Sequence, residues 1–313
     1  MPPLVFSPFL RPMPWGGRRL GDTLGKPLPP DGTWGESWEV SAHPTHVSRV
    51  ADGPLAGRAL TDLLPGFPLL VKYLDANDWL SVQVHPGDDK AMSLSGEPLG
   101  KTEAWVVLGA EPGGRIFAGM KDGIDRRAFE RALAEKRVAE CLHAFQPRVG
   151  DCLFYPAGTV HAVGGGVLLA EVQQSSDATL RLYDWDRVGP DGKPRPLHVA
   201  QALEAIDWGR GPVAPAVGQA LPGLPGERLV VCRYFTLDRF RVAEPVPSPY
   251  GGRLSLWMVL DGAAELRARD YRRVLPRGGT VVVPAGVEGV SWHPSPAATL
   301  LGVTLPEGLS GPP

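Results

Sequence analysis

Short segments in which apolar and polar residues alternate recur along the chain, and clusters of glycine and proline separate them. Alternation with a period of two is typical of strands that are buried on one face. The 313 residues include 39 glycines and 34 prolines, and both residue types mark turns, because glycine permits positive φ angles and proline fixes φ and lacks an amide proton. Since 43% of the residues are hydrophobic, the chain can still bury a substantial core. The pattern therefore predicts a turn-rich, mostly β architecture.

Strand patterns dominate the first part of the chain. Residues 1–35 contain many turn pairs and are expected to be irregular. Residues 122–145 change to helical spacing, with Asp125 as a possible N-cap, so we expect a small helical insertion there. A short helix is also expected at 197–206. The expected strands are 35–44, 67–76, 79–85, two strands within 103–120, and strands within 147–163, 167–176 and 178–186.

A second series of strand patterns begins at about residue 228. Residues 211–227 are rich in glycine and proline, have no periodicity and are expected to form a linker. The stretch RVGDCLFYPAGTVH (148–161) resembles RGGTVVVPAGVEGV (277–290), with one residue fewer between glycine and proline in the second copy. This repeat indicates two related barrels, of which only the first carries His161; Gly289 takes its place in the second. We therefore expect domains at 1–210 and 228–313.

Composition and charge exclude several classes of protein. The net charge is −2, so no nucleic acid or anionic membrane partner is expected. Three widely spaced cysteines argue against a disulfide framework and a thiolate metal site. No stretch approaches 18 uninterrupted apolar residues, and the N-terminus lacks the pattern of a signal peptide. A cytoplasmic protein is expected; no pattern specifies an oligomeric state.

Residues 79–107 place polar side chains inside apolar strand patterns. Gln83 and His85 are two apart, so both would point to the same face of a strand, and Glu103 begins the next strand after a loop. Buried polar groups need partners, and imidazole and carboxylate groups are ligands for zinc and similar ions. With His161 from a distant strand, they form a candidate metal site. The alternatives are a hydrogen-bonded turn histidine at His85 and a satisfied core histidine at His161.

A second set of charged residues lies near these candidates in the strand patterns. Glu171 shares a face with the apolar residues of 167–173, and Arg181 lies within an apolar strand. An inward guanidinium needs an anion such as phosphate or a carboxylate; a salt bridge to Glu171 or Asp184 is the alternative. Lys101 would enter on the same face as Glu103, unless it is a solvated loop lysine.

Several stretches, in this order, carry a family resemblance: GESWEVSAHP (35–44), WLSVQVHP (79–86), GKTEAW (100–105), YPAGTVHAV (155–163), EVQQSSDATLRLYDWDR (171–187) and PRPLHVAQALEAIDW (194–208). Together they resemble the type I mannose-6-phosphate isomerases, particularly the short bacterial form. The resemblance is strong over residues 1–210 and weak beyond. It implies a mostly β fold of two cupin (jelly-roll) barrels with a small helical insertion, which is a reduced version of the insertion in longer relatives.

The resemblance also implies an activity and a set of site residues. The activity is a zinc-dependent aldose–ketose isomerisation of mannose 6-phosphate and fructose 6-phosphate through an enediol. One zinc ion per chain would be held by Gln83, His85, Glu103 and His161. Arg181 and Lys101 would be active-site cations that stabilise the enediolate or bind the phosphate. Ser81 would help to hold the phosphate.

The sequence does not single out one catalytic base. Glu171, Lys101 and a water on the metal are the candidates. Two other functions compete with the isomerase: a metal-dependent cupin dioxygenase and a non-catalytic cupin that binds a sugar phosphate. Gln83 in a ligand position, together with Arg181 and Lys101 as anion-binding groups, argues against the dioxygenase, and the full ligand set argues against the non-catalytic protein.

Overall fold

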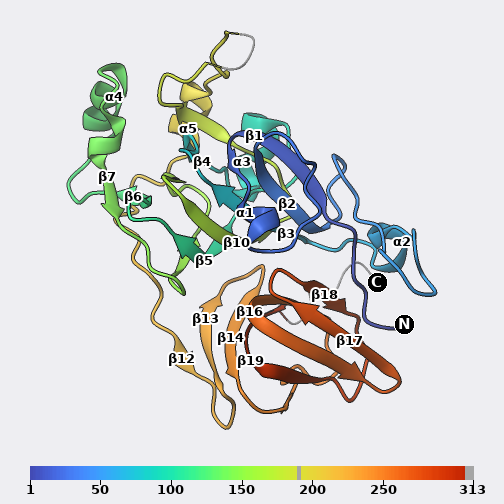
Figure 1. Ribbon diagram of the computed structural model, residues 1–313. Coiled ribbons are helices and arrows are strands. Elements are labelled where there is room, and N and C mark those ends of the chain that lie inside the picture. Colours follow the sequence, from blue (N-terminus) through green and yellow to red (C-terminus); the bar gives the residue numbers. More distant parts are fainter. Residues whose placement is uncertain (189–191, 307–313) are drawn as a thin grey trace.

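The protein is mostly β, with 42% of its residues in strands and 12% in helices. The computed structural model describes residues 1–188 and 192–306, so the last residues of the expected C-terminal domain, 307–313, lie outside the described residues. The strands form three antiparallel sheets. In Figure 1 the strands of the first part of the chain (blue to yellow-green) lie above the strands β12 to β19 (orange to red). The prediction of a mostly β fold is confirmed.

The first part of the chain forms two sheets. The six-stranded sheet has the order β1-β2-β3-β10-β5-β8, and the five-stranded sheet has the order β11-β4-β9-β6-β7. Their strands are β1 (Phe9–Gly17), β2 (Trp34–Ser41), β3 (Leu69–Ala76), β4 (Val82–Val84), β5 (Glu103–Ala110), β6 (Arg115–Met120), β7 (Leu142–Phe145), β8 (Cys152–Tyr155), β9 (His161–Gly164), β10 (Val167–Gln174) and β11 (Leu180–Tyr183).

The third sheet contains the strands of the second part, in the order β12-β13-β14-β19-β16-β17, with β15 paired to β19 and β18 paired to β16. These are β12 (Gln219–Ala220), β13 (Gly226–Val231), β14 (Thr236–Val242), β15 (Val246–Pro247), β16 (Ser255–Ala268), β17 (Tyr271–Pro276), β18 (Thr280–Val283) and β19 (Ser291–Thr304).

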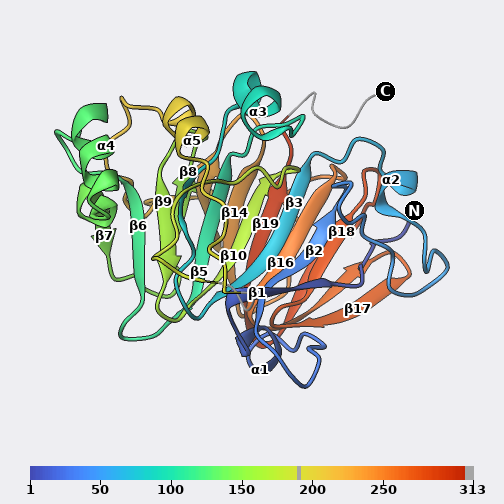
Figure 2. The ribbon, with the colours of Figure 1, turned by 90° about the horizontal axis from the view of Figure 1, so that it is seen from above.

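The helices are short and lie outside the sheets. They are α1 (Arg19–Asp22), α2 (Leu60–Leu63), α3 (Asp88–Ser95), α4 (Arg126–Ala134), the 3₁₀ helix η1 (Val138–Cys141) and α5 (Val199–Ala205). Figure 2 shows α3, α4 and α5 along the same edge of the sheets. None of the helices in the described ranges is long and apolar enough to span a membrane.

Strand β10 explains how the layers are held together, because it is buried along its whole length. Val167 and Leu169 pack into a core that includes side chains of both sheets of the first part. Leu168 and Ala170 point the other way, into a core that continues into β16, β18 and β19 of the third sheet. Because successive side chains of a strand point to opposite faces, β10 contributes to a core on each face. The core that contains Leu168 and Ala170 joins the two parts of the chain.

The internal repeat occupies equivalent places in the two parts. Both copies form a short strand, β8 and β18, which ends in a Pro-Ala-Gly corner. Gly150 and Gly278 before the strands have φ of 93° and 84°, and Gly158 and Gly286 at the corners have φ of 87° and 81°, values that favour glycine. The sequence comparison expected one residue fewer between glycine and proline in the second copy, and this expectation is wrong. The glycine with the conformation of Gly150 is Gly278, not Gly279. The intervals 150–156 and 278–284 therefore have the same length.

Two elements differ from the sequence-based expectation. Residues 1–35 are not irregular throughout, since β1 pairs with β2 at the edge of its sheet, with breaks in register near Pro12. Prolines are tolerated at such an edge. Helix α3 lies in the segment expected to be a loop; it follows Gly87 and ends at Gly96, whose φ is 75°.

The helical insertion is shorter than its predicted range. The expected range 122–145 holds α4 and η1, and its last four residues form β7. Asp125 caps α4 as expected, because its side chain accepts a hydrogen bond from the Ala128 amide. In the expected linker 211–227, β12 and the first residues of β13 form strands.

Candidate active site

Cross-strand register aligns the predicted site residues on both sheets. In the five-stranded sheet, Gln83 of β4 is paired with Arg181 of β11 on one side and His161 of β9 on the other. In the six-stranded sheet, Glu171 of β10 is paired with Lys72 of β3. Directly paired side chains point to the same face. The two sheets share a core, so these two rows of polar side chains meet where that core ends.

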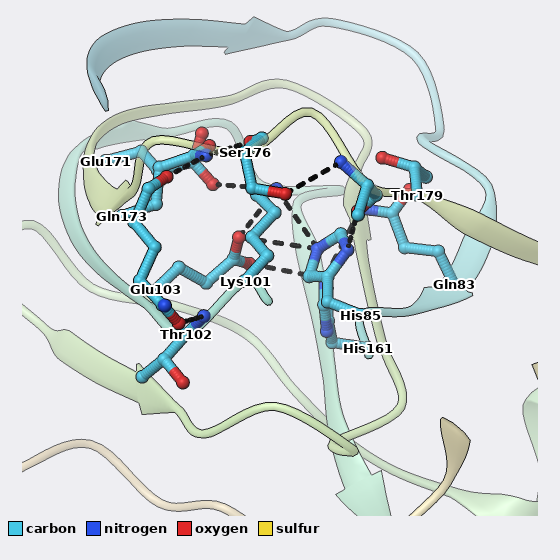
Figure 3. A network of polar contacts seen from close by, with 12 residues as sticks. Gln83, His85, Lys101, Thr102, Glu103, His161, Glu171, Gln173, Ser176 and Thr179 are labelled. Carbon is cyan, nitrogen blue, oxygen red and sulfur yellow. Dashed lines mark hydrogen bonds and ion pairs between the residues drawn. The ribbon is translucent and has the colours of Figure 1, made fainter. Parts of the chain in front are cut away.

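His85, Glu103 and His161 form one buried group (Figure 3). Nε2 of His85 lies 3.3 Å from Oε2 of Glu103, and Nε2 of His161 lies 3.3 Å from Oε1 of the same carboxylate. All three side chains are at most 2% exposed. Segments that are far apart in the sequence thus bring two imidazoles to the two oxygens of one carboxylate.

Both imidazoles are oriented by the backbone. Nδ1 of His85 lies 2.6 Å from the carbonyl oxygen of Ala178, and Nδ1 of His161 lies 3.0 Å from the carbonyl oxygen of Thr159. Each Nδ1 therefore carries the proton and donates it, which leaves the lone pair of Nε2 directed at the centre of the group. Burial, followed by the charge of Lys101, lowers the pKa of His85 to about 3, and burial also lowers the pKa of His161. Both rings are therefore neutral and able to bind a cation.

Lys101 supplies positive charge to the group. Its Nζ lies 2.7 Å from Oε2 of Glu103 and 3.1 Å from Nε2 of His85. Burial disfavours the charge of Glu103, but the ammonium of Lys101 outweighs it and holds the pKa of Glu103 well below its usual value. Burial likewise opposes the charge of Lys101, and Glu103 and Glu171 outweigh it and raise the lysine pKa. Lys101 is not a solvated loop lysine.

The group fits a divalent cation. Apart from the ion pair that Oε2 makes with Lys101, both carboxylate oxygens of Glu103 are buried without a hydrogen-bond donor among the described residues, so they retain lone pairs for a metal ion. Two neutral imidazoles and one carboxylate are a typical donor set for zinc with an open coordination position. The donor atoms of the three residues lie within 4.8 Å of one another.

Gln83 and Ser81 lie beside this group. The side-chain nitrogen of Gln83 is 3.3 Å from Nε2 of His161, and its Oε1 accepts a hydrogen bond of 3.1 Å from Ser81. In this orientation the amide presents a donor to the histidine lone pair. A half-turn of the amide would present its oxygen instead, and only an oxygen can serve as a metal ligand.

Glu171 is the second buried carboxylate of the site. One of its oxygens accepts a hydrogen bond of 2.9 Å from the Trp105 indole, and the carboxylate lies 3.6 Å from Nζ of Lys72 and 3.7 Å from Nζ of Lys101. Burial raises the pKa of Glu171 to about 7, although Lys101 opposes this shift. A carboxyl group with such a pKa can both accept and donate a proton near neutral pH.

A pocket opens beside the metal group. Ser81, Gln83, Lys101, Glu171 and Arg181 all line it, so the structure brings together residues predicted for both the metal and the substrate. Its other charged lining residues are Arg11, Glu36, Lys72, Asp177 and Arg195.

Arg181 has no carboxylate partner among the described residues, so the alternative of a salt bridge to Glu171 or Asp184 is not realised. Asp184 pairs with Arg195, with Nε at 2.7 Å from Oδ2, and Glu171 lies with the two lysines. The Nε of Arg181 is buried without a hydrogen-bond acceptor. Burial and then the neighbouring Arg195 lower the pKa of Arg181. Arg181 and Arg195 line the same pocket, and only Arg195 has a carboxylate partner, so the two guanidinium groups together form a place for an anion.

Lys72 and Arg195 are pocket residues that the sequence analysis did not identify. Lys72 is 2% exposed and interrupts β3, in which all residues are buried. It stacks on Trp38 at 5.1 Å. A polar residue within an apolar strand pattern was the signal that identified Gln83 and His85, and it could have identified Lys72. Arg195 follows an irregular segment and carries no comparable signal.

Comparisons with known proteins identify relatives that match almost the whole chain. A family model described as the catalytic domain of type I phosphomannose isomerase matches residues 6–98. The mannose-6-phosphate isomerase of Streptococcus mutans is 34% identical over 303 residues, which are 93% of this chain and 94% of the relative. The mannose-6-phosphate isomerase ManA of Bacillus subtilis is 32% identical, over 91% of this chain and 94% of the relative. The crystal structure of a mannose 6-phosphate isomerase from Bacillus subtilis superposes with a TM-score of 0.88 and 29% identity, and covers 97% of this chain and 100% of that chain.

Proposed function

The chain belongs to the type I phosphomannose isomerase family, and from this premise we propose that it interconverts mannose 6-phosphate and fructose 6-phosphate by means of one zinc ion. The buried group of His85, Glu103 and His161 carries the proposal. Its neutral imidazoles and unbonded carboxylate oxygens support a catalytic metal, and the charged pocket beside it supports a sugar phosphate.

His85, Glu103 and His161 would hold the zinc ion, with Gln83 as a further ligand if its amide turns. A bound zinc ion supplies positive charge that stabilises the negative charge growing on a substrate oxygen. The single Nε2 lone pair of His85 cannot serve both the ion and the ammonium of Lys101, and the two positive charges repel each other. With zinc in place, we therefore expect Lys101 to turn toward Glu171, which is 3.7 Å away, and to face the pocket.

Arg181 and Arg195 would bind the phosphate. Arg181 has the free charge, and Arg195 adds a second guanidinium that Asp184 holds in place. Ser81 lines the same pocket and donates its hydroxyl to Oε1 of Gln83. After a half-turn of the amide, the Ser81 oxygen would accept from the Gln83 nitrogen and hold the side chain in the ligand orientation, in addition to the predicted role of Ser81 beside the phosphate.

Glu171 would carry the proton between the two carbon atoms of the substrate. The isomerisation removes a proton next to a carbonyl and returns it to the neighbouring carbon, through an enediol. Glu171 has a pKa near 7 and is flanked by Lys72 and Lys101. The two ammonium groups would stabilise the oxygens that become negatively charged while Glu171 holds the proton.

The two predicted domains would differ in function. We propose that residues 1–210 form the catalytic domain and that the barrel at 228–313 has no metal centre. In support, the only cluster of three metal-type side chains among the described residues is the one in the first domain. In the second copy of the repeat, Gly289 stands where the first has His161.

A coupled assay tests the proposal directly. Purified protein is supplied with mannose 6-phosphate, and fructose 6-phosphate is measured before chelation, after chelation and after zinc is restored. We expect turnover that disappears with chelation and returns with zinc. Oxygen consumption in the same mixture, or binding of the sugar phosphate without turnover, would replace the isomerase with the dioxygenase or with the non-catalytic protein.

A further inference from the structure

A single hydrogen bond connects the second barrel to the segment that precedes the metal ligand Glu103. Tyr234, between β13 and β14, donates its hydroxyl to Oδ2 of Asp88 over 2.7 Å. Asp88 is the first residue of α3, three positions after His85. Arg233 also approaches Oδ2, at 3.7 Å, but its side chain is 76% exposed, so its ion pair contributes little.

Asp88 in turn holds the backbone next to Lys101. Its Oδ1 accepts hydrogen bonds of 2.9 Å from the Gly100 amide and from the side chain of Gln174. Gln174 accepts a hydrogen bond of 2.9 Å from the Thr102 amide. The amides on both sides of Lys101 are therefore fixed, one directly and one through Gln174. Side chains of Lys101 and Glu103 leave this short segment toward the metal group.

The backbone is closely packed at Gly100, so the position of residues 100–103 depends on the contacts that Asp88 makes. A Cβ atom at Gly100 would lie 2.6 Å from both the Asp88 nitrogen and the Gly87 carbonyl carbon. The Lys101 amide also donates to the carbonyl oxygen of Pro86, over 3.0 Å. The backbone before Glu103 thus lies directly on the backbone after His85, and a shift of one changes the distance between these two metal ligands.

We infer that Tyr234 is a positioning residue for the metal centre: through Asp88 it fixes the segment that presents Lys101 and Glu103. The second barrel, which has no metal group of its own among the described residues, thereby contributes to the geometry of the first. This inference rests on the proposed metal-dependent function. None of the polar groups involved contacts the pocket, since neither Tyr234 nor Asp88 lines it.

The test compares metal affinity in two tyrosine variants of the full chain. Metal-free protein is titrated with zinc against a competing chelator. For Tyr234→Phe we expect zinc affinity to fall about 10-fold, at the lower end of the range for hydrogen-bond partners outside the metal ligands. In the same variant kcat should fall and KM for mannose 6-phosphate should stay constant, because the phosphate-binding arginines are unaffected.

Tyr250→Phe is the matched control. It removes a hydroxyl of the same barrel that donates to another aspartate, Asp238, over 3.2 Å. It should lower the unfolding temperature without changing zinc affinity. Asp88→Ala should weaken zinc binding at least as much as Tyr234→Phe, and the double variant should be no worse than Asp88→Ala alone, because both changes break the same connection.

Two results would overturn the inference: unchanged zinc affinity in Tyr234→Phe, or equal losses in both tyrosine variants that follow their unfolding temperatures. Failure of the proposed function is a separate result. If the wild-type protein binds zinc but does not isomerise mannose 6-phosphate, the proposed substrate is wrong, and the difference in zinc affinity between the tyrosine variants still decides the role of Tyr234.

Discussion

Glu103 is the residue on which the charge balance of the site depends. It is fully buried, contacts two neutral imidazoles and is charged because Lys101 lies 2.7 Å away. A buried charge that loses its partner typically costs about 3–5 kcal/mol. The site is therefore stable only with a cation beside Glu103, either the lysine or a metal ion. A metal ion has to compete with Lys101 for Glu103, so His85 and His161 have to contribute strongly to metal binding.

His161→Ala tests that contribution. The change removes one of the imidazoles that face Glu103, so zinc affinity should fall by more than the roughly 10–100-fold typical of losing a hydrogen-bond partner of a ligand. Metal analysis after dialysis measures the bound zinc. His143→Ala, a histidine that packs on Phe145 in β7, should retain zinc as the control. Full zinc content in His161→Ala would remove this residue from the ligand set.

Arg181→Ala tests the assignment of the phosphate. Because this guanidinium has no carboxylate partner, its loss should lower kcat/KM for mannose 6-phosphate by about 10²–10³-fold and leave bound zinc unchanged. Arg195→Ala should have a smaller effect, since Asp184 already neutralises much of that charge. Turnover of unphosphorylated mannose should be the same in wild type and Arg181→Ala. An equal loss with both sugars would instead place Arg181 at the reacting oxygens.

The polar residues of the site could be predicted from sequence wherever a strand pattern framed them. Gln83, His85, Glu103 and Arg181 interrupt apolar sequence patterns. In the structure Gln83 and Arg181 are paired across β4 and β11, Glu103 begins β5, and His85 follows β4 and does not lie in the predicted strand. The sequence could not give their partners: a salt bridge of Arg181 to Glu171 or Asp184 was one alternative, and it does not form, because Asp184 pairs with Arg195 and Glu171 lies with two lysines. Which cation meets which anion depends on packing between distant segments.

At the scale of elements, α3 shows where sequence patterns were too weak. It has only one buried side chain, Ala91, so it lacks the apolar stripe that predicts a helix. The signals at its two ends are the acidic residues Asp88 and Asp89 in the first turn and Gly96 directly after the last turn. Strand β1 was missed for a related reason, because its prolines and glycines indicate turns unless the strand lies at a sheet edge.

Asp88 should make the stability of this element depend on pH. Burial opposes its charge, but hydrogen bonds from Tyr234, Gln174 and Gly100 outweigh it and lower the pKa of Asp88 below its usual value. A carboxyl with a lowered pKa stabilises the folded state above its unfolded pKa of about 4, and this contribution disappears as pH falls through the folded value.

Thermal unfolding of metal-free wild type and Asp88→Asn between pH 6 and pH 3 measures this contribution. Other carboxylates titrate in the same range, so the difference between the two proteins is the informative quantity. Wild type should be more stable at pH 6, and the difference should shrink below about pH 4. A difference that is constant across this range would mean that the charge of Asp88 does not stabilise the contact.

At the scale of the whole molecule, the two parts share one apolar layer. Leu168 and Ala170 of β10 and Leu256 and Met258 of β16 belong to the same core. A linker was predicted between the domains, but this shared core means that the free energies of unfolding of the two barrels depend on each other. The sequence indicated two barrels from the repeated Pro-Ala-Gly corner, but it did not indicate this shared layer, because full burial on both faces erases the alternation that marks which side of a strand faces the partner.

Met258→Ala tests whether the two parts unfold together. Met258 is fully buried in the shared layer, so its truncation should cost about 2–5 kcal/mol. Native-state hydrogen exchange should show lower protection in both β10 and β16. Glu288→Gln, a change at an exposed ion pair with Arg269, should leave protection and turnover unchanged. Loss of protection confined to β16 would mean that the barrels unfold independently.

We propose that one zinc ion, held by His85, Glu103 and His161, gives this chain its mannose-6-phosphate isomerase activity. The most direct measurement is a titration of metal-free protein with zinc, in which bound zinc and isomerase turnover are recorded in the same sample. Turnover should rise from the baseline in proportion to bound zinc and reach its maximum at one ion per chain. Full turnover in protein shown to contain no metal, or turnover that stays at the baseline when one ion is bound, would contradict the account.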